Sequence, residues 1–150
     1  MRTRILQRET FVAKPIQEVF NFFSKTENLI LITPAHLNFK IATPGPILMA
    51  KGTMIDYKLK LYGIPFKWKT EITAWQAPFT FTDKQLKGPY LKWIHQHQFE
   101  EREGGTLMTD RVEYAIPGWI IEPLIYTFFI KGNIDAIFNF REKSVTEIFK

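Results

Sequence analysis

The sequence predicts an α+β domain in which a curved antiparallel sheet, made mainly of consecutive hairpins, packs against one long C-terminal helix. Three observations indicate this class. Apolar residues alternate with polar ones between residues 53 and 116, which is the period of strands with one buried face. Apolar residues recur at helical spacing before this region and again in residues 119–149. The apolar content of 45% in 150 residues suffices for one core, so we expect residues 1–150 to form a single domain.

Residues 3–12 are expected to form the first strand, which ends before Pro15. Proline is favourable at the first position of a helix, and the residues after it carry an i, i+3, i+4, i+7 apolar pattern. This pattern predicts a short amphipathic helix that buries Ile16, Val19, Phe20 and Phe23. A second helical turn is expected at residues 27–32, followed by an extended segment at residues 37–42 that ends at Pro44-Gly45-Pro46.

The alternating region divides into five strands that form an antiparallel meander. Clusters of turn-forming residues separate these strands at residues 62–65, 76–78, 87–90 and 103–105. Pro117-Gly118 then ends the sheet. The helix after it begins with an apolar run, Trp119–Ile130, which is shorter than the roughly twenty residues of a membrane span. We interpret this run as a buried helix.

Composition excludes several classes of protein. The chain has no cysteine, which excludes disulfides, thiolate metal sites and cysteine nucleophiles. The first residues lack the apolar segment of a secretory signal, so we expect a cytoplasmic protein. The net charge of +5 is compatible with an anionic partner. No helix-turn-helix, zinc finger or aromatic RNA-binding pattern occurs, so we expect no nucleic-acid partner.

Several short stretches, taken in their order along the chain, resemble one superfamily. Near the N-terminus they are residues 15–20 with Phe22-Phe23-Ser24, then Asn28-Leu29 and Ile32-Thr33-Pro34. Among the hairpins they are residues 43–46, 52–53, 55–57, 88–90, 93–99 and 105–112. Together they resemble the START-like, Bet v 1-like SRPBCC superfamily, and in particular its bacterial ligand-binding and polyketide-cyclase-like members.

This resemblance covers essentially the whole chain and implies the helix-grip fold, in which the long helix lies across the concave face of the sheet. It also implies an internal hydrophobic cavity for a lipid, polyketide, quinone or similar ligand, while a minority of members act as cyclases, aromatases or hydrolases. A shared fold does not establish a shared reaction. Binding and catalysis therefore both remain open.

The turns also predict which residues face one another across the sheet. The last turn of the meander places His97 opposite Asp110, and the turn before it places Asp83 opposite His95. All four side chains would then share one face with aromatic side chains. A shift of one residue in any strand would move that strand's members to the other face.

Three roles are open for Asp83, His95, His97 and Asp110. They orient the polar end of a ligand, or they only satisfy one another's hydrogen bonds, or an Asp-polarised His acts as a general base. No nucleophile elbow, phosphate loop, dinucleotide fingerprint or HExxH helix occurs, so catalysis has no support beyond the resemblance. The spacing of the four residues is not a recognised metal signature, so we predict neither a metal site nor a cofactor.

The apolar and aromatic residues on this face form either a cavity wall or a filled core. Aromatic stripes are more often core, but the resemblance favours a cavity closed by the last helix. We therefore predict as ligand contacts Tyr57, Leu59, Trp68, Thr70, Phe81, Asp83, Gln85, Trp93, His95, His97, Phe99, Met108, Asp110, Tyr114, Ile134 and Phe138.

The opposite face of the first hairpin carries four lysines. They are Lys58, Lys60, Lys67 and Lys69, and we expect them to lie across the strands from one another. Like charges in such positions are mildly destabilising, and transient contact with an anionic membrane surface is one interpretation of them, although a solvated face is the more common case. The alternative is an ordinary solvated face, because Asp56 and Glu71 lie nearby.

We predict that the protein binds a hydrophobic or amphipathic small molecule in an internal cavity, as a carrier or a sensor. One alternative is an enzyme of the cyclase, aromatase or dehydratase type, with His97, Asp110, His95 and Asp83 as candidate catalytic residues. A second alternative is an interaction module with a filled core and no ligand. The sequence predicts neither the identity of the ligand nor the oligomeric state.

Overall fold

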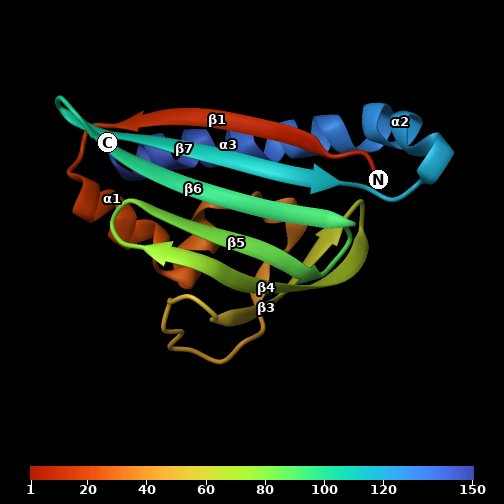
Figure 1. The fold of residues 1–150 in the computed structure, drawn as a ribbon, viewed down its shortest axis with the longest axis horizontal. Coiled ribbons are helices and arrows are strands. Elements are labelled where there is room, and N and C mark those ends of the chain that lie inside the picture. The colour runs from red at the N-terminus through yellow and green to blue at the C-terminus, as the bar shows by residue number, and fades with distance from the viewer.

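Seven strands form one antiparallel sheet in the order β1-β7-β6-β5-β4-β3-β2, and the computed structural model describes all 150 residues (Figure 1). The strands are β1 (Arg4–Val12), β2 (Lys40–Ile41), β3 (Met54–Leu61), β4 (Ile64–Gln76), β5 (Thr80–Lys87), β6 (Lys92–Arg102) and β7 (Gly105–Ala115). β3 to β7 follow one another as the predicted meander, while β1 pairs with β7 along its whole length. Neighbouring hairpins therefore build most of the sheet.

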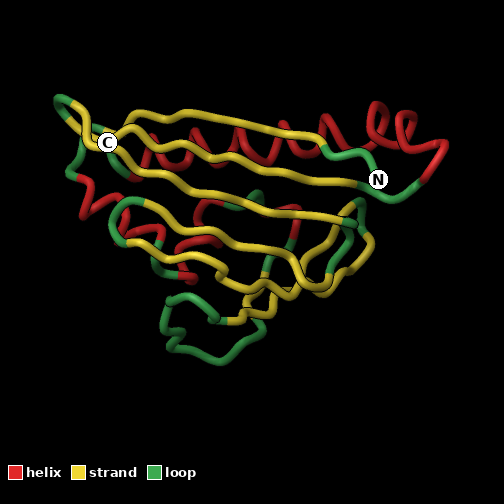
Figure 2. Tube along the Cα trace, in the orientation of Figure 1, coloured by secondary structure: helices red, strands yellow, loops and turns green.

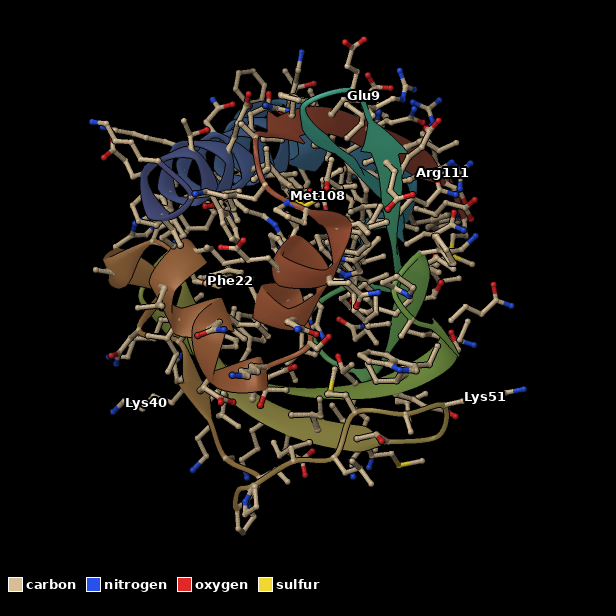
Figure 3. The ribbon with its side chains drawn as sticks, turned by 90° about the vertical axis from the view of Figure 1, so that its left-hand side faces the viewer. Glu9, Phe22, Lys40, Lys51, Met108 and Arg111 are labelled. Atoms are coloured by element: carbon tan, nitrogen blue, oxygen red, sulfur yellow. The ribbon has the colours of Figure 1, made fainter.

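Two groups of helices pack against this sheet (Figure 2). After β1 come α1 (Ile16–Phe23) and the two 3₁₀ helices η1 (Thr26–Ile32) and η2 (Ala35–Leu37). After β7 come η3 (Trp119–Ile121), α2 (Glu122–Ile125), the π-helical turn η4 (Tyr126–Ile130) and α3 (Lys131–Ile148). Seen from the side, the sheet curves around both groups (Figure 3). The predicted α+β class and the long C-terminal helical segment across the sheet are confirmed.

The first helix has the predicted position and the predicted buried face. Pro15 precedes its first residue, and its buried side chains are Ile16, Val19, Phe20 and Phe23. The predicted helical turn at residues 27–32 is confirmed as a 3₁₀ helix over residues 26–32, but the segment after it differs from the prediction, because a second 3₁₀ helix ends at Leu37. Asn38 then takes a left-handed conformation with φ of 50°. The extended part is therefore limited to Lys40–Ile41.

The predicted register of the last two hairpins is confirmed. His97 lies opposite Asp110 between β6 and β7, and Asp83 lies opposite His95 between β5 and β6. Because side chains alternate between the two faces of a strand, this register places all four on the inner face. The same register would place Gln85 opposite Trp93, but the ladder between β5 and β6 ends at Lys84, so these two residues do not pair.

The turn of the first hairpin is shorter than predicted. Only Tyr62 and Gly63 form it, with φ values of 53° and 75°. Two successive residues with positive φ make the tight turn whose twist matches that of the flanking strands. Ile64 and Pro65, which were predicted to lie in the turn, are the first residues of β4.

The shorter turn shifts β4 by two positions, so the four lysines of this hairpin do not pair as predicted. Lys58 lies opposite Lys67, whereas Lys69 lies opposite Asp56. The Lys69 Nζ is 3.7 Å from the Asp56 Oδ1. A shift of two residues keeps each side chain on its face. The lysines therefore still face away from the helices, but within this hairpin only one pair of like charges is directly opposed.

The core has two parts that lie at different ends of the inner face. The first packs α1 and the end of α3 against the sheet, and its members include Phe20, Phe81, Phe99, Met108 and Val145. The second packs the start of α3 against the sheet, and its members include Tyr90, Val112, Tyr114, Ile134 and Phe138. Burial of these side chains, at about 25 cal/mol per Å² of apolar surface, is the main force that holds the helices in place.

The run Trp119–Ile130 is helical, but it is not buried. Trp119, Ile120 and Phe128 are 89%, 77% and 72% exposed. β7 ends at Ala115, and the helical segment around α2 projects past the ends of β1 and β7, where no strand lies beneath it (Figure 1). The prediction of a buried helix is therefore wrong for this run. No helix of the structure combines the length and the apolar character that crossing a bilayer requires.

Candidate functional site

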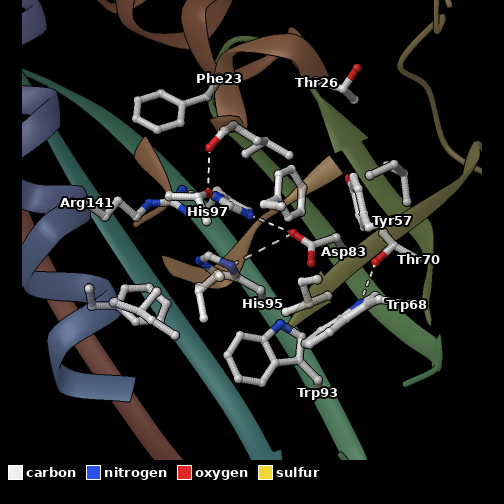
Figure 4. Close-up of a pocket in the computed structure, with 18 of the residues that line it drawn as sticks. Phe23, Thr26, Tyr57, Trp68, Thr70, Asp83, Trp93, His95, His97 and Arg141 are labelled. Atoms are coloured by element: carbon white, nitrogen blue, oxygen red, sulfur yellow. Dashed lines mark hydrogen bonds and ion pairs between the residues drawn. The ribbon is translucent and has the colours of Figure 1, made fainter. Parts of the chain in front are cut away.

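A cavity of about 180 Å³ lies between the sheet, α3 and the segments that follow β1 (Figure 4). Strands β3 to β6 form one side of its wall, while α1, η1 and α3 form the other. Of the 22 residues in the wall, 15 are hydrophobic. Phe81 and Phe138 belong to the wall and also to the two core clusters, so the cavity borders both parts of the core.

Most of the residues predicted to contact a ligand line this cavity. They are Tyr57, Leu59, Trp68, Thr70, Phe81, Asp83, Trp93, His95, His97 and Phe138. All but Phe138 belong to strands β3 to β6, where the alternation of side chains gave the inward face directly. The inner face of these strands is thus a cavity wall along much of its length.

Six predicted residues do not line the cavity. Phe99 and Met108 fill the first core cluster, and Tyr114 and Ile134 fill the second. Gln85 instead holds the turn after β5, where its amide bonds both the N–H and the carbonyl of Tyr90 at 3.2 and 2.8 Å. The sixth, Asp110, lies beside the histidines of the wall. The inner face is therefore part cavity wall and part filled core.

The two histidines and the two aspartates form hydrogen bonds along the diagonals of the ladder. His95 Nε2 is 2.8 Å from Asp110 Oδ1, and His97 Nε2 is 2.7 Å from Asp83 Oδ2. The residues that are directly opposite one another have longer separations, 3.5 Å for His97 and Asp110 and 3.9 Å for His95 and Asp83. The two imidazole rings stack with their centroids 3.7 Å apart. The predicted group is thus assembled, but with exchanged partners.

Arg141 of α3 completes this group and was missed by the sequence prediction. Its Nη2 lies 3.5 Å from Asp110 Oδ1 and 3.4 Å from His97 Nδ1. Its Nε is buried and has no hydrogen-bond partner. Arg141 lies three residues after Phe138 and four before Val145, both buried, so the helical spacing of the last helix contained the signal for its inward position.

The charges of this group follow from burial and from the partners. Burial alone would raise the pKa of Asp83, but the hydrogen bond from His97 and the nearby positive charges lower it below its usual range. Asp110 behaves in the same way, mainly because of Arg141 and His95. Burial, and secondarily the electrostatic repulsion between the two neighbouring imidazoles, lowers the pKa of His97 to about 4. At neutral pH the group therefore contains two carboxylates and a neutral His97.

These charges assign the direction of each hydrogen bond. An ionised carboxylate can only accept, so His97 Nε2 donates to Asp83 and His95 Nε2 donates to Asp110. A neutral His97 then accepts from Arg141 at its Nδ1, which matches the observed contact. His95 Nδ1 has no hydrogen-bond partner within the protein. Because His95 lines the cavity, this nitrogen and the second oxygen of Asp83 are the groups left for a bound molecule.

Solved structures with this architecture are known, although no family model and no curated protein matches the sequence. Protein CV1439 from Chromobacterium violaceum aligns with a TM-score of 0.72 over 99% of this chain and 98% of its own, at 12% identity. Ginseng major latex-like protein 151 from Panax ginseng aligns with a TM-score of 0.69 over 99% and 98%, at 13% identity. Ara h 8.0201 aligns with a TM-score of 0.62 over 96% and 98%, at 15% identity.

The chain has the helix-grip fold of Bet v 1-like proteins. The predicted likeness to these proteins is confirmed at the level of the fold, which is what identities of this size establish. Function has to be argued from the site of this helix-grip protein itself.

The remaining residues of the helix-grip cavity were not predicted. They are Phe23, Thr26, Leu29, Thr33, Leu37, Phe39, Met49, Leu61, Ile72, Tyr90, Ile137 and Arg141. Leu61 and Ile72 continue the alternation of β3 and β4, and Phe23 and Ile137 lie on buried helical faces, so periodicity could have found them. Thr33, Phe39 and Met49 lie in irregular segments, where no period indicates the inward side.

Two hydroxyl groups, those of Tyr57 and Thr70, add further hydrogen-bonding groups to the wall. Burial, and secondarily the charge of Asp83, raises the pKa of Tyr57 above its usual range, so its hydroxyl stays protonated. The Trp68 indole donates to the Thr70 hydroxyl at 3.0 Å. Both hydroxyls lie in the wall with Asp83. The site can therefore form hydrogen bonds but presents no activated nucleophile.

Asp83, His95 and His97 are the residues that could hold a metal ion, since their ligand atoms lie within 4.8 Å of one another. Two features oppose this use. Both imidazole Nε2 atoms already donate to carboxylates, and the Arg141 guanidinium lies 3.4 Å from His97. A cation would have to displace these bonds beside a fixed positive charge. The arrangement is better suited to organic polar groups.

Proposed function

We propose that this helix-grip protein binds an amphipathic small molecule, with its apolar body in the cavity and its polar group at Asp83 and His95. The observation that carries the proposal is a largely apolar cavity with one ionised, hydrogen-bonded cluster in its wall. Ligand sites of proteins typically combine a hydrophobic wall with a few placed polar groups. The protein would act as a carrier or a sensor of this molecule.

The volume of the cavity limits the size of the ligand. Apolar cavities of about 150 Å³ in proteins bind benzene. The cavity of about 180 Å³ therefore accommodates at least one ring with its substituents. The cavity is also partly open, so a longer apolar tail can extend out of it.

The charges of the site indicate which polar group the ligand carries. Asp83 is ionised and 20% exposed at the cavity, so it accepts a hydrogen bond from the ligand. A ligand carboxylate is disfavoured, because Asp83 and Asp110 already face the single guanidinium of Arg141 while His97 is neutral. A hydroxyl, phenol or enol fits best, since it donates to Asp83 and can accept from the Tyr57 hydroxyl.

The first test is native mass spectrometry of the protein purified from its own host, before and after extraction with organic solvent. We expect one bound species in stoichiometric amount, which the solvent releases and which carries a hydroxyl group. A folded protein that is empty in this experiment and takes up no hydroxylated apolar compound would contradict the proposal.

Filling the cavity should remove the ligand. Thr70 is 2% exposed and lies in the wall, so a Thr70→Trp side chain would occupy the space of the bound molecule. We expect the affinity for the ligand to fall at least about tenfold, as for the loss of roughly 1.4 kcal/mol or more. Ligand occupancy is measured by native mass spectrometry, and circular dichroism monitors the fold.

Two further variants make this test specific. Leu59→Trp also projects into the cavity but replaces a side chain that is only half-buried, so it strains the core less. Thr109→Trp on β7 points to the outer face and should leave occupancy unchanged. Full occupancy in both cavity variants would show that the ligand binds elsewhere.

A second candidate function is catalysis with His95 as general base. The observation that favours it is the hydrogen bond from His95 Nε2 to Asp110, which leaves Nδ1 free on a residue of the wall. An Asp-oriented imidazole of this kind can take a proton from a ligand hydroxyl or C–H group, as a cyclase or dehydratase requires. Asp110→Asn would then leave the ligand bound but stop any change in its mass during incubation. A ligand that is recovered unchanged from the wild-type protein would exclude this candidate.

A further inference from the structure

An exposed apolar ridge lies at one end of the molecule, outside the cavity. It consists of Trp119, Ile120, Ile121, Leu124, Phe128 and Phe129, all of which are more than half exposed. Ile120, Leu124 and Phe128 are spaced by four residues and form one stripe along the helical segment. Contiguous exposed apolar surface of this kind is uncommon in proteins that have no partner for it.

The ridge carries no exposed charge. Glu122 is the only charged residue between Trp119 and Ile130, and its side chain turns inward to accept two hydrogen bonds from Arg4, at 2.8 and 3.0 Å. Arg2 contributes a weaker ion pair at 3.9 Å. Two exposed positive side chains lie close to the ridge: Arg2, through its ion pair with Glu122, and Lys131, which follows Ile130 in the chain.

The ridge adjoins the first hairpin and, through it, the cavity. The Tyr62 ring packs edge-on against Phe129 with the centroids 6.2 Å apart, and its hydroxyl donates to the Phe129 carbonyl. Leu61, the residue before Tyr62, lies in the cavity wall. Ile64, on the other side of the turn, is also exposed. Whatever covers the ridge therefore lies close to one end of the cavity.

We propose that the ridge is a docking surface for a lipid bilayer with anionic headgroups. Large apolar side chains with a tryptophan at one end and basic residues at the flanks are the composition of helical segments that lie in a membrane interface. The absence of exposed acidic groups fits an anionic lipid surface. The segment also projects from the end of the molecule, so it can enter a bilayer without other elements in the way (Figure 1).

Sedimentation with lipid vesicles tests the proposal. We expect the protein to bind vesicles of phosphatidylcholine with phosphatidylglycerol more tightly than vesicles of phosphatidylcholine alone. The double variant Trp119→Ser, Phe128→Ser should lose binding at least about tenfold, because it removes two of the largest exposed side chains. Leu48→Ser is the matched control, since Leu48 is equally exposed but lies in the loop before β3.

A second measurement locates the contact. Brominated lipids quench tryptophan fluorescence at short range, and Trp119 is the exposed tryptophan among the four in the chain. We expect quenching in the wild-type protein and its loss in Trp119→Phe, a variant that retains vesicle binding. Unchanged quenching in Trp119→Phe would place the contact elsewhere and overturn the proposal.

Three other outcomes would also overturn the proposal: no sedimentation of the wild-type protein at low salt, equal sedimentation of the double variant, or a dimer that the double variant abolishes. The dimer would assign the ridge to a second copy of the chain.

The docking proposal does not depend on the cavity ligand, because no ridge residue lines the cavity. Vesicle binding with an empty cavity would support docking and contradict the proposed function.

Discussion

The protonation state of His97 depends on its burial inside the sheet. Its side chain is 4% exposed, and burial, together with electrostatic repulsion between the two neighbouring imidazoles, lowers its pKa to about 4. In an unfolded chain a histidine titrates near pH 6.5. Between roughly pH 4 and 6.5 the folded protein therefore binds fewer protons at this residue than the unfolded protein does.

We predict that acid destabilises the fold within this pH range. The contribution of His97 is fully present above about pH 6.5 and is lost as the pH falls toward 4, because protonation then favours the unfolded chain. The loss amounts to roughly 3 kcal/mol. The lowered pKa values of Asp83 and Asp110 add to it mainly below about pH 4, where unfolded aspartates are mostly protonated. Urea unfolding at about pH 7 and about pH 4.5 measures the difference.

His97→Gln is the control for this assignment. The amide can still donate to Asp83, as His97 Nε2 does, but it does not titrate. The variant should therefore lose less stability than the wild-type protein when the pH is lowered. An equal loss in both proteins would show that another group is responsible.

The positions of single residues were predictable where a period applied. Asp83, His95, His97 and Asp110 were placed on one face because alternation and turn positions define a register. Their hydrogen-bond partners were not predictable, since a side chain can reach diagonally across a ladder as well as directly. That choice depends on rotamers, which only the packed structure defines.

At the scale of elements, the first hairpin depends on a turn in which both residues have positive φ. Gly63 adopts φ of 75°, and a β-carbon added to it would have nothing within 4 Å, so its conformation rather than its surroundings requires glycine. The sequence prediction placed a longer turn here, at residues 62–65, which includes Pro65. The structure has the shorter one, because Tyr62-Gly63 supplies a turn that matches the twist of the strands.

We predict that Gly63→Val destabilises the protein by about 1–2 kcal/mol, the usual cost of a left-handed conformation for a residue with a β-carbon. Gly132→Ala should instead stabilise it by about 0.5–1 kcal/mol, since Gly132 lies within α3 and has nothing within 4 Å of an added β-carbon. Both values are measured by chemical unfolding. A neutral Gly63→Val variant would contradict the assigned turn.

At the scale of the whole molecule, the net charge of +5 is distributed unevenly. Lys58 lies opposite Lys67 on one side and opposite Lys40 of β2 on the other, so three lysines form a row across three strands. Like charges in a row repel one another and attract an anionic surface. Two of these lysines, Lys58 and Lys67, belong to the hairpin whose turn packs against the apolar ridge.

We predict that the lysines of this hairpin account for most of the salt dependence of vesicle binding. Replacing Lys58, Lys60, Lys67 and Lys69 by glutamine should weaken binding to anionic vesicles at low salt by at least about tenfold, since each basic residue near such a surface contributes about 1 kcal/mol. Added salt should then have little further effect. The control variant replaces four exposed lysines outside this hairpin and so has the same net charge as the test variant. These lysines are Lys25, Lys51, Lys143 and Lys150. Equal weakening in both variants would show that only the total charge matters.

The sequence by itself determined the order of the elements, the α+β class and the inner face of the strands. These features follow from local periodicity and from turn residues, which act over a few positions along the chain. Local periodicity also explains why the buried face of α1 was predicted correctly. It also explains why ten of the predicted contacts lie in the cavity wall.

Only the tertiary structure decided which inward residues enclose empty space and which fill the core. Met108 and Trp93 follow the same alternation, yet one packs under α1 and the other borders the cavity. Arg141 joins His97 across 44 positions of sequence, and the run Trp119–Ile130 is exposed because the sheet ends before it. Such outcomes depend on how far each element extends over its neighbours. The periodicity of a single segment does not predict this overlap.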